Sequence, residues 1–137
     1  MIVLDTNVAA ELMKPNPDRR VVTWLNKQPQ AVLLTSVTVA EISFGIERLP
    51  EGPRKSGLEK IFEDLMELCF AADVLPFDDA AARTFGRLLG GLRRSGKTMT
   101  TNDGMIAAIA LEHRCSLATR NVADFAHTGL RIINPWA

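Results

Sequence analysis

The sequence lacks the features that would direct it out of the cell or into a membrane. Its two cysteines, Cys69 and Cys115, lie in apolar stretches without the spacing of a disulfide framework or a zinc site. No apolar run reaches the roughly 20 residues needed to cross a bilayer. The first residues also lack the basic start and long apolar segment of a signal peptide. We therefore expect a cytoplasmic protein with buried thiols and no membrane contact.

The chain also has a formal net charge of zero and contains no tyrosine. Sixteen basic residues balance sixteen acidic ones, so the chain lacks the overall positive charge typical of domains that bind nucleic acids. With no tyrosine, few aromatic side chains are available to stack on bases, and Trp24 and Trp136 are equally well explained by packing. A neutral total can still combine an acidic site with a basic surface. These absences argue modestly against nucleic acid but do not exclude it.

The order of apolar runs predicts an α/β fold. Short apolar runs bounded by polar residues are typical of buried strands, and longer stretches with apolar residues at helical spacing indicate helices. We expect strands at 2–4, 31–34, 74–76, 116–119 and 131–133, and helices at 6–13, 18–28, 37–49, 54–71, 78–95 and 100–113. Strands that alternate with helices favour a mostly parallel sheet covered on both faces. The length and the absence of a linker predict one domain, residues 1–137.

Three aspartates fall where a parallel sheet would bring them together. Asp5 ends the first strand, Asp103 lies at the head of a helix, and Asp124 follows the strand at 116–119. In open α/β sheets the working cleft lies beyond the carboxyl ends of the strands. Each aspartate has an ordinary structural alternative as a helix cap, a partner of the helix dipole or a turn residue.

Glu41 is harder to explain by a structural role. It is the only charged residue from Ser36 to Ile46, and an unpaired buried carboxylate is costly. Carboxylates that converge repel one another, and hard divalent cations such as Mg²⁺ or Mn²⁺ relieve that repulsion with oxygen ligands. The four acids therefore predict a metal site, and a metal that activates water is suited to hydrolysing a phosphodiester bond.

Polar and basic residues near these acids suggest supporting roles. Thr6, Asn7, Thr119 and Asn121 are candidates to hold a carboxylate or a water molecule without adding charge. In the helix at 78–95, Arg83, Arg87 and Arg94 lie opposite the apolar stripe. Such arginines are suited to contact RNA phosphates, but a solvated helix face explains them equally well.

Several motifs resemble those of one family. They are residues 2–7 (IVLDTN), 35–42 (TSVTVAEI) with 45–46 (GI), 102–108 (NDGMIAA), 117–125 (LATRNVADF) and 134–136 (NPW). In this order they resemble the PIN-domain toxins of bacterial toxin–antitoxin pairs, the VapC type with its FitB-like branch. The resemblance covers essentially the whole chain.

That resemblance implies a PIN-like fold with a sheet of about five strands. It also implies an endoribonuclease dependent on Mg²⁺ or Mn²⁺, a homodimer, and inhibition by a small cognate antitoxin of the VapB type. Asp5, Glu41 and Asp103 match the family's core acidic residues, Asp124 matches its more variable fourth acid, and Thr119 matches its usual serine or threonine. Gly104 departs from many relatives, which carry a side chain there, and we expect it to loosen the start of the helix.

Two other functions compete with the nuclease. A phosphatase or dehalogenase would use Asp5 as a nucleophile but would want a second acid where the chain has Asn7. A purely binding α/β module would use the acids for a structural cation. The helices at 18–28 and 54–71 are also candidates to form an apolar groove for a partner helix, although core packing explains most of their apolar positions.

Overall fold

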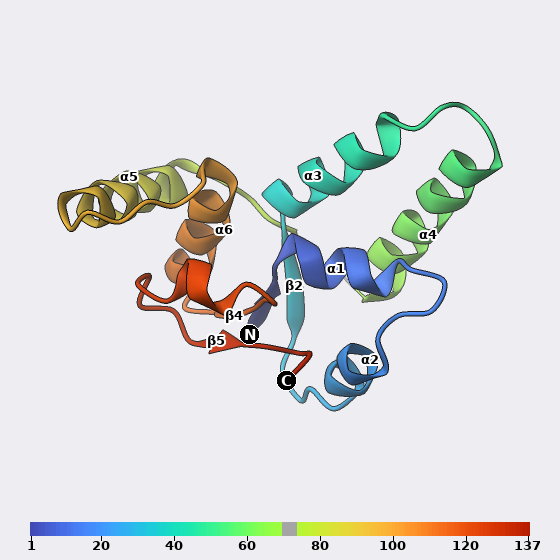
Figure 1. Cartoon of the computed structure of the whole chain (residues 1–137), viewed down its shortest axis with the longest axis horizontal. Helices are drawn as coiled ribbons and strands as arrows, with labels where there is room; N and C mark the ends of the chain where they lie inside the picture. Colours follow the sequence, from blue (N-terminus) through green and yellow to red (C-terminus); the bar gives the residue numbers. More distant parts are fainter. Residues whose placement is uncertain (70–73) are drawn as a thin grey trace.

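The computed structural model describes residues 1–69 and 74–137, and Figure 1 shows its arrangement. The strands are β1 (Ile2–Leu4), β2 (Val32–Thr35), β3 (Val74–Leu75), β4 (Ser116–Ala118) and β5 (Ile132–Ile133). They form one five-stranded sheet in the order β3-β2-β1-β4-β5, and every neighbouring pair is parallel. The predicted α/β fold with a mostly parallel sheet of about five strands is confirmed.

Six α-helices and one 3-10 helix connect the strands. They are α1 (Thr6–Leu12), α2 (Arg19–Asn26), α3 (Ser36–Glu47), α4 (Pro53–Cys69), α5 (Asp79–Arg94), α6 (Thr101–Glu112) and η1 (Val122–Phe125). Most bounds agree with the predicted ones within two residues. The last residues expected in the helix at 54–71 fall outside the described part of the chain. The prediction missed η1, because Asp124 was expected in an irregular loop.

Alternate residues of the central strand face the two halves of the core. Ile2 and Leu4 pack in a cluster with residues of α1, α2, α3 and α4. Val3 packs in the other cluster, which includes the buried residues Ile106 and Ile109 of α6. This alternation is the side-chain period of a strand, and it explains why β1 is apolar at every position. Helices consequently cover both faces of the sheet (Figure 1).

Side-chain caps place the helix starts at the carboxyl end of the sheet. Thr35 is the last residue of β2 and is fully buried, and its hydroxyl accepts a hydrogen bond from the Thr38 N–H at 3.2 Å. Thr100 accepts from the Asp103 N–H at 3.2 Å at the start of α6. Such caps satisfy amides that have no partner within the helix. α3 starts directly after β2, and α6 lies in contact with α3.

Gly104 allows α5 and α6 to approach closely. A Cβ at this position would lie 2.6 Å from Leu89 Cδ1 and 3.0 Å from Phe85 Cε2. Real Cβ atoms essentially never come that close to a neighbour, so no side chain fits without movement. α6 is regular there, and the Thr100 hydroxyl caps the Asp103 N–H, so the loosening expected at Gly104 stays a prediction. The glycine provides room for side chains of α5.

None of the helices in the described residues is long and apolar enough to cross a membrane.

Candidate active site

Asp5 lies buried at the carboxyl end of the central strand. It is 4% exposed, and its Oδ1 accepts a hydrogen bond from the Thr6 N–H at 2.8 Å, which caps α1. Its Oδ2 accepts from the Thr119 hydroxyl at 2.7 Å and from Asn7 Nδ2 at 3.3 Å. Burial raises the pKa of Asp5, the bonds from Thr119 and Thr6 oppose this, and the charges of Asp103 and Glu41 raise it further. The Asp5 side chain thus has two roles, because it caps α1 and also belongs to the candidate site.

Thr119 holds the strand ends together beneath this carboxylate. β1 and β4 are paired with Leu4 opposite Ala118, so the next residues, Asp5 and Thr119, emerge side by side. The Thr119 hydroxyl, which is fully buried, donates to Asp5 and accepts from Asn7 Nδ2 at 3.3 Å and from the Asn121 N–H at 3.0 Å. All its hydrogen-bonding capacity is therefore used, and the Asp5 side chain is held in one orientation.

Glu41 is linked to the first helix through hydroxyl groups. The Thr6 hydroxyl donates to Glu41 Oε1 at 2.9 Å and lies 3.0 Å from the Thr38 hydroxyl. Because Thr6 has one hydroxyl proton, the Thr38 hydroxyl must donate to Thr6 when Thr6 donates to Glu41. Thr38 is fully buried on α3, one turn before Glu41. Glu41 itself is half-buried rather than sealed in the core.

Asp103, on α6, lies near the carboxylates of Glu41 and Asp124. It is half-buried in the first turn of that helix. Burial raises the pKa of Asp103, the Thr100 side chain opposes this, and the charges of Asp124 and Glu41 add to the increase. The mutual effects among Asp5, Glu41, Asp103 and Asp124 indicate that the four predicted acids do gather at one end of the sheet.

Asp124 and Asn121 are the most open members of this group. Both side chains are exposed; Asp124 lies in η1, and Asn121 immediately precedes that helix. The Asn121 backbone N–H bonds to Thr119, so η1 starts directly from the buried part of the site. Asp124 therefore lies at the exposed rim of the acidic site, whereas Asp5 lies at its buried base.

Residues 2–129 match the sequence profile of the PIN domain family. The chain belongs to the PIN domain family. It is 42% identical to the VapC ribonuclease Y4jK of Sinorhizobium fredii, with 99% of this chain and 98% of that protein covered. It is 36% identical to the toxin FitB of Neisseria gonorrhoeae, with 99% of both chains covered. The crystal structure of FitAcB from the same organism superposes with a TM-score of 0.91 over 99% of both chains.

The acids of this PIN domain fit a divalent cation bound partly through water. Within the described residues, no three acidic, histidine or cysteine side chains lie close enough to ligate one ion together. Mg²⁺ in proteins usually keeps several waters and takes one or two carboxylates, with substrate phosphate completing its shell. Burial is the main cause of the raised pKa values of Asp5 and Asp103, and the neighbouring carboxylates add negative charge that a cation would relieve. The donor set, all oxygen, suits Mg²⁺ or Mn²⁺.

Two residues of the site were not predicted from the sequence. Thr38 looked like one of several small residues in an apolar helix, and only its burial next to Thr6 shows its role. Arg120 follows Thr119, and its backbone N–H donates to Asn7 Oδ1 at 3.3 Å. A threonine one turn before the isolated Glu41 was the available signal for Thr38. No sequence signal pointed to Arg120.

The arginines of α5 lie on its exposed side. Arg83 pairs with Asp79 at 3.0 Å, Arg87 donates to the Thr84 hydroxyl at 3.0 Å, and Arg94 is exposed near the end of the helix. Their predicted contact with RNA stays a prediction.

An apolar groove runs along α1, α3 and α4. Its volume is about 760 Å³, and its lining includes Ala10, Met13, Ile42, Ile46, Leu58 and Ile61. Thr6 and Glu41 line it too, so it reaches the acidic site. The expectation for a groove at the helix 54–71 agrees with this position, since α4 forms one wall. The helix 18–28 contributes no residue to this groove, and Val21 packs in the core, so a partner surface on α2 stays a prediction.

Proposed function

We propose that this chain is the toxin of a toxin–antitoxin pair and that it cleaves RNA as a Mg²⁺- or Mn²⁺-dependent endoribonuclease. The observation that carries the proposal is the convergence of Asp5, Glu41 and Asp103, from three separate elements, on one end of the sheet. The raised pKa values of Asp5 and Asp103 support a site built for a cation. Relatives named as a VapC ribonuclease and as a toxin, matched over nearly their full length, support the choice of RNA and the toxin role.

The four acids have graded roles in this proposal. Asp5 and Asp103 hold the cation, and Glu41 and Asp124 complete the acidic surroundings and orient the attacking water. The bound cation supplies charge for the phosphoryl oxygens and lowers the pKa of a bound water. Thr119 and Asn7 fix the Asp5 carboxylate through their hydrogen bonds, and Thr6 fixes Glu41 in the same way.

The chain works in the cytoplasm as a single PIN domain, residues 1–137, and as a homodimer.

Its antitoxin occupies the groove along α1, α3 and α4, because an apolar surface of this size suits an amphipathic segment. The groove ends at Thr6 and Glu41, so an occupant also blocks the acidic site. The similar solved structures of FitAcB and of VapBC-1 from Haemophilus influenzae support such a partner.

Expression in bacteria without the antitoxin tests the toxin role. We expect the wild-type chain to arrest growth and degrade cellular RNA, because the acidic site is then uninhibited. Glu41→Gln should relieve the arrest, and the exposed Glu59→Gln, outside the site, should not. Growth curves and RNA gels at matched protein levels provide the measurement. Equal growth with wild type and Glu41→Gln would favour a binding module without nuclease activity.

The metal can be tested by thermal unfolding. Without metal, Asp103→Asn should raise Tm by roughly 2–5 °C, because the folded state disfavours the ionised Asp103 carboxylate. An acid whose folded pKa is raised costs stability above that pKa, so the difference should shrink as pH falls through the carboxyl range. Adding Mn²⁺ should raise the Tm of wild type and of Glu59→Gln more than that of Asp103→Asn. An equal metal effect on all three would contradict a cation at Asp103.

A further inference from the structure

A basic surface begins directly beside the acidic site. Arg120 follows Thr119, and its backbone is tied to Asn7, which also bonds Asp5. The Arg120 guanidinium lies over the Trp136 ring, 5.1 Å from the ring centroid. A guanidinium at this distance is attracted by the electrons of the ring. The indole is 6% exposed and packed in the core, so it gives the Arg120 charge a fixed position.

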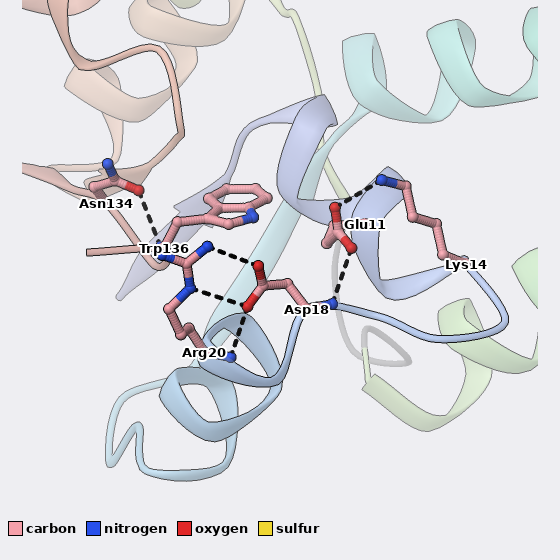
Figure 2. A network of polar contacts seen from close by, with 6 residues as sticks. All are labelled: Glu11, Lys14, Asp18, Arg20, Asn134 and Trp136. Carbon is pink, nitrogen blue, oxygen red and sulfur yellow. Dashed lines mark hydrogen bonds and ion pairs between the residues drawn. The ribbon is translucent and has the colours of Figure 1, made fainter.

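The same surface continues onto α2. Asp18 caps this helix, and Arg20 binds both carboxylate oxygens, with Nε at 3.1 Å and Nη2 at 2.8 Å (Figure 2). The hydrogen bonds from Arg20 lower the pKa of Asp18 to about 2, and the charge of Arg120 contributes. Asp18 thus lies close enough to Arg120 for the two charges to interact, although the two residues are far apart in the sequence. Asp18 and Arg20 neutralise each other, so the positive charge of this surface comes from Arg19, Lys27 and Arg120.

Arg19, Arg20 and Lys27 surround a shallow hollow between α2 and the last residues of the chain. The hollow measures about 400 Å³, is also lined by Trp24 and Pro135, and has no acidic side chain in its described lining. Within the described residues, Arg19 and Lys27 form no ion pair. These two exposed cations, which have no counter-ion among residues 1–69 and 74–137, are available to an anionic partner.

The position of α2 is fixed by a buried carboxylate. Glu11 is 6% exposed, and it accepts hydrogen bonds from the Asp18 N–H at 3.0 Å and from Lys14 Nζ at 2.9 Å (Figure 2). These bonds tie the start of α2 to α1. Arg19 and Lys27 therefore lie on a helix whose start is bonded to α1, the helix that contains Thr6 and Asn7 of the acidic site.

We propose that Arg19, Lys27 and Arg120, the basic surface, bind the phosphate backbone of the RNA strand whose scissile bond enters the acidic site. This inference rests on the proposed nuclease function. Cations on the surface beside a cluster of acids favour the approach of a polyanion to a metal-assisted site, because the acids alone would repel it. Backbone contacts of this kind supply affinity without reading sequence.

The arginines of α5 are a less suitable path. Arg83 is already paired with Asp79, and Arg87 is bound to Thr84, whereas Arg19 and Lys27 have no such partners among the described residues. Arg120 is also one residue from Thr119 and bonded to Asn7, which connects the basic surface directly to the site. The two surfaces offer matched variants with the same change in charge.

The test measures RNA affinity of the purified chain by fluorescence anisotropy. A labelled single-stranded RNA of about 20 nucleotides is titrated at several salt concentrations into Asp103→Asn protein, which binds without cutting. We expect Arg19→Gln with Lys27→Gln, and separately Arg120→Gln, to weaken binding about 3- to 10-fold and to reduce its salt dependence. Arg83→Gln with Arg87→Gln should leave both unchanged. In otherwise wild-type protein, the basic-surface variants should raise KM for cleavage and leave kcat nearly unchanged.

The outcomes separate this inference from the function on which it rests. If the wild-type chain cleaves RNA but the basic-surface variants bind it as tightly as the parent, the inference is wrong and the nuclease stands. A loss confined to the α5 variants would move the RNA path to that helix. If the wild-type chain neither binds nor cleaves RNA, both proposals fall. Unchanged melting temperatures of the variants verify that any loss is not due to unfolding.

Discussion

Asp5→Asn, Glu41→Gln and Asp103→Asn should each reduce RNA cleavage by at least about 10²- to 10³-fold while leaving the fold intact. Each change removes one negative oxygen donor from the acidic site and retains the shape of the side chain. Asp5→Asn also leaves one oxygen where two now accept the bonds from Thr6, Asn7 and Thr119, so this variant should be the least active. Initial cleavage rates under saturating metal, with circular dichroism as a check of folding, measure the effect.

Asp124→Asn serves as the graded comparison. Its side chain is exposed at the rim of the site and accepts no hydrogen bond from another described side chain, so we expect a smaller loss, about 10-fold. Glu59→Gln on the outer face of α4 should retain full activity. If Asp124→Asn reduced the cleavage rate more than the other three changes, the proposal that Asp124 lies at the rim and contributes less than Asp5 would be contradicted.

Gly104→Ala should destabilise the protein by about 1–3 kcal/mol, the usual cost of overpacking a core. The added methyl group would lie 2.6 Å from Leu89 Cδ1 and 3.0 Å from Phe85 Cε2, so these side chains must shift or α5 and α6 must separate. The expected sign is informative, because glycine to alanine inside a helix normally stabilises by about 0.5–1 kcal/mol. Denaturant unfolding, monitored by circular dichroism, provides the free energies.

Gly86→Ala and Leu89→Ala complete this test. Gly86 lies in α5, and a methyl group added there would meet no atom within 4 Å, so its change to alanine should be neutral or stabilising. Leu89→Ala makes room for a methyl group at Gly104, so the double variant should be more stable than the sum of the two single changes predicts. Simple additivity would mean that the contact between Gly104 and Leu89 does not limit how closely the helices pack.

The local patterns of the sequence were sufficient to predict the sheet and to place Asp5 beside Thr119 at its carboxyl end. Apolar, β-branched runs such as 2–4 form buried strands, and a parallel sheet necessarily collects the residues that follow them. Asp5 and Thr119 were therefore predictable neighbours, and the register of β1 and β4 confirms that they emerge together. Glu41 was identifiable because its helix contains no other charge nearby.

Contacts between distant segments were not predictable in the same way. The bond from Arg120 to Asn7 joins residues 113 positions apart, and nothing in either local pattern indicates the partner. The lining of the groove depends on how α4 folds back on α3, which periodicity does not specify. Gly104 looked like a weak point in a helix because its neighbours on α5 are set by tertiary packing alone.

Metal-dependent cleavage by the purified chain tests the central claim most directly. Protein without any inhibitor is incubated with a pool of structured RNA in the presence of Mg²⁺, Mn²⁺ or EDTA, beside the Asp5→Asn variant. The account predicts cleavage by the wild-type chain with either metal, none with EDTA, and none by Asp5→Asn under any condition. Cleavage that persists in EDTA or in the Asp5→Asn variant would contradict a nuclease site built from these carboxylates.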